Sequence, residues 1–105
     1  MYTRNVSMKL KANSAQEFTR TLENEVIPVL RKQKGFKDEI TLVAPERNDA
    51  LAISFWDKKE DAEAYNREKY PEVLKTLSKV VDGTPRVESF EVANSTSHQI
   101  AAKAA

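Results

Sequence analysis

The sequence has 105 residues, of which 40% are hydrophobic and 31% are charged, and its 17 Lys and Arg residues nearly balance 16 Asp and Glu residues. This length fits a single domain, and a net charge of +1 lacks the strong basic field of a nucleic-acid-binding surface. The absence of cysteine excludes disulfides and thiolate chemistry, and His98, the single histidine, provides no cluster for a metal. No apolar run approaches the roughly 20 residues that span a bilayer or forms a signal peptide at the N-terminus, so we expect a small soluble protein of the cytoplasm.

The N-terminal residues 2–12 predict a strand. Apolar side chains occupy every second position of this segment, with polar residues between them. This period of two is typical of a strand with one buried face. Arg4 falls on the apolar side, near the end that we expect to fray.

The next segment predicts a long helix over residues 14–34. Ser14 and Glu17 have the spacing of a capping box, and apolar residues then recur every three or four positions. Pro28 has no N–H for a helical hydrogen bond, so we expect a kink or a second short helix that begins near it. Gly35 follows, and glycine is the residue type that ends a helix in the left-handed conformation.

The middle of the chain predicts two more strands. Residues 36–44 alternate in hydrophobicity, and the polar segment 45–49 predicts a turn after which residues 50–56 return antiparallel. Ser54 is the only polar residue of that third strand. A strand without alternation is covered on both faces, so we expect it in the centre of the sheet.

The C-terminal half predicts a divided helical region and a last strand. Residues 57–69 form a highly charged helix, and Pro71 suits the first turn of a second one. The Asp-Gly-Thr-Pro segment at 82–85 ends that helix. Residues 86–93 form the last strand, and their apolar positions change parity, which indicates a bulge or an edge strand.

This order of elements defines the fold class. Strand-helix-strand-strand-helix-strand is an α+β, ferredoxin-like βαββαβ plait with a four-stranded antiparallel sheet and its helices on one face. Because the third strand has apolar side chains on both faces, we expect a homodimer whose sheets face each other. The side chains expected to face the shared interior are Val43, Ala52, Ser54 and Trp56. The alternative is a monomer whose small side chains face water, with Trp56 at the rim of the sheet.

Several local motifs together resemble one known family. They are Gly35-Phe36, Phe55-Trp56-Asp57, Tyr70-Pro71 and Gly83-x-Pro85. Over nearly the whole of residues 1–93 the chain resembles the antibiotic-biosynthesis-monooxygenase (ABM) domain family, and residues 94–105 form a tail that we expect to be mobile or docked on a partner. The resemblance implies a dimeric α+β barrel, and the family includes quinone-forming monooxygenases without cofactor and haem-degrading oxygenases.

Neither of these chemistries has its complete set of residues here. Trp56 matches the aromatic residue of the monooxygenases, but Ala52 stands where that branch has an asparagine that holds a substrate oxygen. The haem-degrading branch has an axial histidine on the helix after Pro71, which this chain lacks, and Asn5 is at the place of that branch's asparagine. We therefore expect no metal and no other cofactor.

The candidate substrate-binding residues are Trp56, Tyr65, Tyr70 and Asn5. The two tyrosines flank the division of the second helical region, where their hydroxyls could meet a ligand, although such tyrosines commonly turn the polar tip to water. Trp56 is either the wall of an aromatic pocket or part of the packed core. No catalytic residue follows from the sequence.

Two functions from different classes fit these observations. The first is a cofactor-independent monooxygenase that acts on a small aromatic or quinone-type compound. The second is a non-catalytic dimeric domain that binds a small molecule or self-associates. An enclosed apolar cavity beside Trp56 and Tyr65 would favour the first, and a filled core would favour the second.

Overall fold

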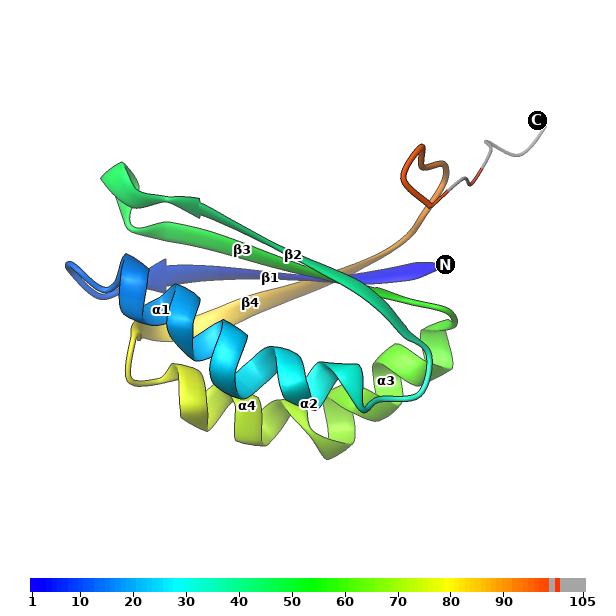
Figure 1. Cartoon of the computed structure of the whole chain (residues 1–105), viewed down its shortest axis with the longest axis horizontal. Coiled ribbons are helices and arrows are strands. Elements are labelled where there is room, and N and C mark those ends of the chain that lie inside the picture. The colour runs from blue at the N-terminus through cyan, green and yellow to red at the C-terminus, as the bar shows by residue number, and fades with distance from the viewer. Residues whose placement is uncertain (99, 101–105) are drawn as a thin grey trace.

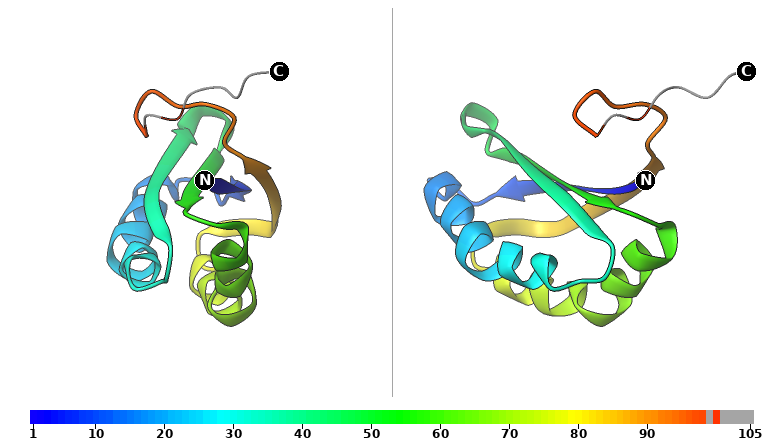
Figure 2. Two further views of the ribbon diagram at one scale, coloured as in Figure 1. Left: turned by 90° about the vertical axis from the view of Figure 1, so that its right-hand side faces the viewer. Right: turned by 45° about the vertical axis from the view of Figure 1, so that its right-hand side comes forward.

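The computed structural model describes residues 1–98 and residue 100, and it contains a four-stranded antiparallel sheet with helices on one face (Figure 1). The strands are β1 (Tyr2–Leu10), β2 (Phe36–Ala44), β3 (Asp49–Trp56) and β4 (Val81–Glu91), in the spatial order β2-β3-β1-β4. The helices are α1 (Ala15–Thr21), α2 (Ile27–Arg31), α3 (Lys59–Glu68) and α4 (Tyr70–Leu77). Viewed from the end, α1 and α2 run beside α3 and α4 below the sheet (Figure 2). The predicted ferredoxin-like fold is confirmed.

The first helical region changes its hydrogen-bond pattern before Pro28. A π-helical turn, Leu22–Val26, separates α1 from α2, and the Ile27 N–H donates to the carbonyl of Leu22. Pro28 then lies in the first turn of α2, where its missing N–H costs nothing. The predicted interruption is confirmed, whereas the capping box is wrong, because Ser14 is the N-cap residue but its side chain makes no capping hydrogen bond.

The second helical region is divided at Lys69. Lys69 leaves the helical conformation between α3 and α4, and Pro71 lies in the first turn of α4. Tyr65 near the end of α3 and Tyr70 at the start of α4 are both buried. The break therefore brings two tyrosines from consecutive helices against the same part of the sheet.

Strand β3 lies in the interior of the sheet, as predicted, but its two faces are the reverse of the expectation. Ala52, Ser54 and Trp56 face the helices, and Trp56 is fully buried in the core cluster. The prediction that these side chains and Val43 face a shared dimer interior is wrong. The physical reason is packing: Phe18 of α1 and Tyr65 of α3 belong to one core cluster with Trp56, so the helices cover the face of β3 that carries Trp56. The large residues Leu51, Ile53 and Phe55 point to the opposite, uncovered face.

Strand β4 is an edge strand with an irregular start. Among the described strands it pairs only with β1, and its register shifts between Ser7 and Lys9 of β1. It begins at Val81, earlier than the predicted residue 86. The predicted edge position is confirmed, whereas the bulge lies before residue 86 and not at the change in parity: residues 87–91 pair with β1 without a shift, so Phe90, which is 56% exposed, lies on the face of the sheet opposite to Val87.

The described part of the tail lies on the uncovered face of the sheet, above the strands in Figure 1. The His98 ring packs against Phe55 with a centroid distance of 4.9 Å, and its Nε2 atom lies 3.4 Å from Asp38 Oδ2. Residue 99 and residues 101–105 lie outside the described residues. Among the residues described, no helix is long and apolar enough to cross a membrane.

Replacing Gly35 by alanine is expected to lower the free energy of unfolding by about 1–3 kcal/mol, because a non-glycine residue is strained at positive φ. Gly35 has φ +79°, as predicted for the end of the helix, and an added Cβ would overlap the Asp61 carboxylate. Gly83, with φ +75° and open space around it, is the matched control that separates strain from overlap. Urea denaturation measures the free energy of unfolding of Gly35→Ala and Gly83→Ala. Equal losses in the two variants would show that overlap with Asp61 adds nothing to the strain of positive φ.

Candidate functional site

A small cavity lies between the sheet and the helices. Its volume is about 40 Å³, which has room for water or for the polar end of a ligand but not for a benzene ring, since a cavity of about 150 Å³ holds benzene. Its polar lining comes from three strands and two helices: Arg4 of β1, Glu39 of β2, Ser54 of β3, Tyr65 of α3 and Tyr70 of α4. Its apolar lining includes Leu22, Val26, Leu30, Val73 and Leu77.

Arg4 is the positive charge of this cavity. The side chain is 4% exposed and its Nη2 atom donates to Asn66 Oδ1 at 2.8 Å. The guanidinium lies 4.4 Å from the ring centroid of Tyr70 and 5.1 Å from that of Tyr65. Burial lowers the pKa of Arg4, yet arginine stays protonated in proteins. Within the described residues it has no ion pair with a carboxylate, so this buried charge can attract an anion.

Tyr65 and Tyr70 contribute neutral hydroxyls. Burial raises the pKa of Tyr65 to about 12 and also raises the pKa of Tyr70, so both hydroxyls are protonated at neutral pH. The Tyr70 hydroxyl is buried beside the Arg4 guanidinium, which acts to lower its pKa, and the hydroxyl hydrogen has no acceptor among the described residues. A buried donor without an acceptor is costly, and a ligand oxygen in the cavity would supply the missing partner.

Glu39 is the acidic group of the cavity. Thr41 Oγ1 donates to Glu39 Oε2 at 2.7 Å. Burial raises the pKa of Glu39, and this effect exceeds that of the hydrogen bond from Thr41, which lowers it. Glu39 is therefore a stronger base than an exposed glutamate.

Trp56 lies in the core behind the cavity, in contact with Ser54 and Tyr65. Its Nε1 donates to Ser54 Oγ at 2.8 Å, which fixes the indole ring. The ring lies 5.2 Å from Tyr65 and 5.7 Å from Phe36, measured between centroids. The indole supports the cavity from behind, through Ser54 and Tyr65, and does not line it.

The structure brings together three of the four candidate site residues. Trp56, Tyr65 and Tyr70 form one cluster on the helix side of the sheet. Asn5 lies on the opposite face, where its Nδ2 donates to Thr3 Oγ1 at 3.2 Å and to the Glu88 carbonyl at 3.4 Å. Arg4, which precedes Asn5 on β1, points to the helix side of the sheet and lines the cavity.

The sequence analysis missed Arg4 and Glu39 as site residues. The signal for Arg4 was present, because a charged residue on the apolar side of a strand is buried unless the strand frays. Glu39 gave no such signal, since the irregularity between Phe36 and Asp38 changes which residues of β2 share a face. Only the register of the folded sheet shows that Glu39 is on the helix side.

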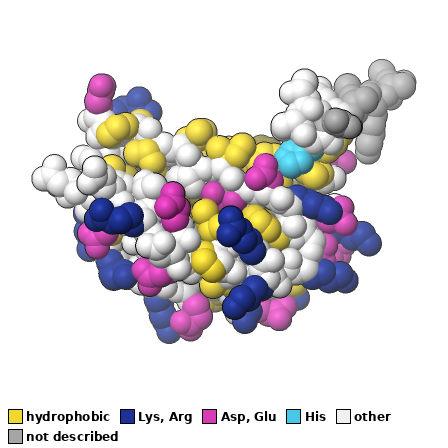
Figure 3. All heavy atoms as spheres, viewed as in Figure 1, with side chains coloured by type: hydrophobic (Ala, Val, Ile, Leu, Met, Phe, Trp, Pro, Cys, Tyr) yellow, Lys and Arg dark blue, Asp and Glu magenta, His cyan; other side chains and the backbone are white. Residues whose placement is uncertain are grey.

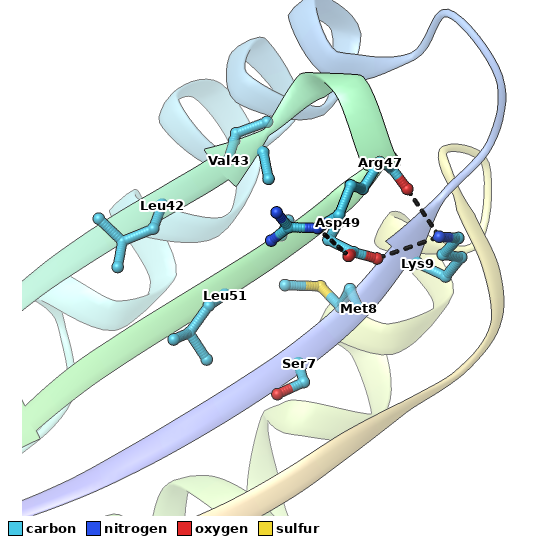
Figure 4. A pocket seen from close by; sticks show the side chains of 10 residues that line it. Ser7, Met8, Lys9, Leu42, Val43, Arg47, Asp49 and Leu51 are labelled. Atoms are coloured by element: carbon cyan, nitrogen blue, oxygen red, sulfur yellow. Dashed lines mark hydrogen bonds and ion pairs between the residues drawn. The ribbon is translucent and has the colours of Figure 1, made fainter.

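A larger hollow, of about 580 Å³, lies at the end of the β2–β3 hairpin beside β1. Figure 4 shows Lys9, Arg47 and Asp49 pointing toward one another there. Lys9 Nζ lies 3.2 Å from one Asp49 oxygen and Arg47 Nε lies 3.1 Å from the other, and these hydrogen bonds lower the pKa of Asp49. Because its charged groups are exposed and paired with one another, this hollow is a weaker candidate than the buried cavity.

No family model matches the sequence, and no curated protein matches it significantly. The fold, in contrast, is that of the solved antibiotic biosynthesis monooxygenase structures. A monooxygenase from Streptomyces coelicolor, the product of ActVA-Orf6, solved with nanaomycin D, has a TM-score of 0.77 and 11% identity, over 90% of this chain and 88% of its own. SnoaB from Streptomyces nogalater, a cofactor-independent oxygenase, has a TM-score of 0.73 and 15% identity over 90% and 95%. A protein of unknown function from Nitrosomonas europaea has a TM-score of 0.74 and 11% identity over 90% and 91%.

Added haem is expected to give no tight complex with a histidine-ligated Soret band and no degradation in the presence of a reductant. A histidine-ligated haem in the cavity would need an imidazole on α4, but Val73 of this helix lines the cavity instead. His98 lies against Phe55, on the face of the sheet away from the cavity. Absorption spectroscopy of the haem titration checks this, and a tight complex that disappears in His98→Ala would contradict it.

Proposed function

We propose that this chain is a cofactor-independent monooxygenase that acts on a small phenol or hydroquinone. The observation that carries the proposal is the buried guanidinium of Arg4, which faces the same cavity as the Tyr70 hydroxyl, whose hydrogen has no acceptor among the described residues. Together they form a site for a phenolate oxygen, and a phenolate is electron-rich enough to react with O₂ itself. The fold shared with a cofactor-independent oxygenase supports the same chemistry.

The reaction balances without a further reductant. The phenol loses its hydroxyl proton and the hydrogen on the carbon opposite, and O₂ supplies one oxygen atom to that carbon while the other leaves as water. Phenol and O₂ thus give a quinone and water, and the four electrons that reduce O₂ come from the substrate. Arg4 stabilises the anionic forms of the substrate oxygen by a charge-assisted hydrogen bond.

The volume of the cavity favours a second candidate, a small-molecule-binding domain without catalysis. About 40 Å³ holds the oxygen end of a ligand but not its ring. Turnover of a phenol therefore requires apolar side chains such as Leu22 and Val73 to move aside. A binding protein needs only the polar end to be recognised.

Oxygen uptake with a panel of phenols and hydroquinones separates the two functions. An oxygenase consumes O₂ with one equivalent of quinone, and Arg4→Met lowers kcat/KM by about 10–100-fold, because a hydrogen bond to a charged group contributes about 1.5–3 kcal/mol. Arg86→Met is the matched control, since Arg86 is exposed and paired with Glu88 at 3.4 Å on the other face of the sheet. Binding without uptake would leave the second candidate, and uptake unchanged in Arg4→Met would contradict this site.

We also infer that two copies pair through the uncovered face of the sheet. Ile40 and Leu42 on this face are 43% and 51% exposed, Leu51 and Ile53 lie beside them, and the His98 ring of the tail packs against Phe55 at the same face. Figure 3 shows hydrophobic side chains along the side away from the helices. A contiguous apolar surface of this kind is typical of an interface between proteins.

Light scattering at micromolar concentration is expected to give the mass of a dimer, with an interface of more than about 1,200 Å² in total. Ile40→Lys places a charge on this face and is expected to give a monomer. Val87→Lys is the matched control, because Val87 is 37% exposed but faces the other side of the sheet. A monomeric mass of the unmodified protein would contradict the inference.

A further inference from the structure

The described part of the tail forms a closed loop on the uncovered face of the sheet, which we call the tail loop (residues 95–98 and 100). The backbone N–H groups of Ser95 and Ile100 each donate to the carbonyl of the other residue, at 2.7 and 2.8 Å. The His98 N–H donates to Ser95 Oγ, and the His98 ring packs on the sheet. Thr96 is exposed. The tail loop is therefore a polar projection from an otherwise apolar face.

The hollow of about 580 Å³ beside the β2–β3 hairpin lies at the other end of the same face. Leu51 of β3 lines the hollow, whereas the tail loop packs on Phe55, four residues further along this strand and so about 13 Å away. Figure 1 shows the hairpin and the tail at opposite ends of the sheet, both on the side away from the helices. Leu42 and Leu51 belong both to the hollow and to the apolar face through which we infer that two copies pair. Each copy thus has one projection and one hollow on its pairing face.

Symmetry limits how two such faces can meet. Two identical faces pack together around a twofold axis that lies in the plane between them, either along the strands or across them. An axis along the strands brings tail loop against tail loop and leaves both hollows empty. An axis across the strands brings each tail loop over the hollow of the other copy. Only the second arrangement fills both hollows at once and closes the assembly as a dimer.

We propose that the hollow beside the β2–β3 hairpin binds the tail loop of a second copy of this chain. This inference rests on the pairing of two copies through the uncovered face, and it adds the orientation of the copies and the segment that joins them. The chemistry of the two surfaces is complementary. Serine and threonine hydroxyls of the tail loop can accept from Lys9 and Arg47 and donate to Asp49, the charged groups of the hollow (Figure 4). These groups therefore keep hydrogen-bond partners when the interface excludes water.

The contact leaves the candidate functional site free. The cavity with Arg4 and Tyr70 lies between the sheet and the helices, on the opposite side of the sheet from the tail loop. Pairing through the uncovered face does not cover it. The role of the tail loop can therefore be tested without any ligand of the cavity.

The test is thiol cross-linking, because the chain has no cysteine and an introduced thiol is therefore unique. Ser7→Cys places a thiol in the hollow, and Thr96→Cys places one in the tail loop. The two variants are unfolded and refolded together and are then treated with a short bifunctional thiol reagent. A covalent dimer is expected from the mixture and from neither variant alone. Ser89→Cys is the matched control for Ser7→Cys, because Ser89 is also exposed but faces the helix side of the sheet, and it is expected to give no product with Thr96→Cys.

A second measurement uses a chain that ends at Val92, which keeps the hydrogen bond from the Val92 N–H to the Met1 carbonyl. Without the tail loop, the dimer is expected to dissociate at a concentration about tenfold higher or more. Light scattering over a dilution series measures this, and thermal unfolding shows whether the shortened chain is folded.

Each outcome decides the proposal. A covalent dimer of Thr96→Cys alone would show loop against loop and would overturn it. A dimer by light scattering that gives no product between Ser7→Cys and Thr96→Cys, or that dissociates equally without the tail, would also overturn it. A monomeric mass of the unmodified protein would refute the pairing and this contact together. The proposed oxygenase fails separately, through absence of oxygen uptake on phenols, a result that does not affect the cross-link.

Discussion

Replacing Phe18 by alanine is expected to lower the free energy of unfolding by about 3–5 kcal/mol, the range for deletion of a buried aromatic ring. Phe18 of α1 is fully buried and belongs to the core cluster that joins the helices to the sheet. Its removal loses the transfer free energy of the ring and leaves a void that the sheet cannot close. The midpoint of urea denaturation measures the loss.

The control for this prediction lies on the same helix. Glu17 is exposed beside Phe18, so Glu17→Ala is expected to change the unfolding free energy by less than about 0.5 kcal/mol. Leu22→Ala, in the π-helical turn, is expected to lose about 2–5 kcal/mol because Leu22 is also buried. An unchanged midpoint in Phe18→Ala would show that this side chain is exposed in solution.

Replacing Arg4 by methionine is expected to have the opposite effect on stability. Exchange of a buried charged group for an apolar residue of similar volume is commonly neutral or raises the free energy of unfolding by up to about 4 kcal/mol. Methionine keeps the contact with the rings of Tyr65 and Tyr70, and Asn66 is exposed, so its amide can turn to water. Thermal unfolding of both proteins in parallel with phenol binding measures the two effects.

Gain of stability together with loss of phenolate binding is the pattern of a residue kept for function. Arg4→Lys is the conservative comparison, because lysine keeps the charge but lacks the planar, multiply donating guanidinium. We expect it to retain part of the affinity for the anion. A fall in stability of more than about 2 kcal/mol in Arg4→Met, a size typical of a broken buried network, would instead indicate a structural role.

Several features follow from short stretches of sequence. Pro28 and Pro71 interrupt the helical regions because neither has a backbone N–H, and Gly35 takes positive φ because it has no side chain to clash. The period of two in residues 2–12 identifies the buried face of β1, including Arg4. These are local properties of the chain, so the sequence alone determines them, and their order determines the plait.

The tertiary structure alone decides which face of β3 is covered. A strand that is apolar on both sides has no local preference, and the choice depends on which side the helices cross and on the size of the side chains they bring. The same holds for the site. Arg4 contacts Asn66, which is 62 residues away in the sequence, and Glu39 reaches the helix side through the register with Ser54. Contacts between distant residues are set by packing, so no periodicity in the sequence could place these two charges in one cavity.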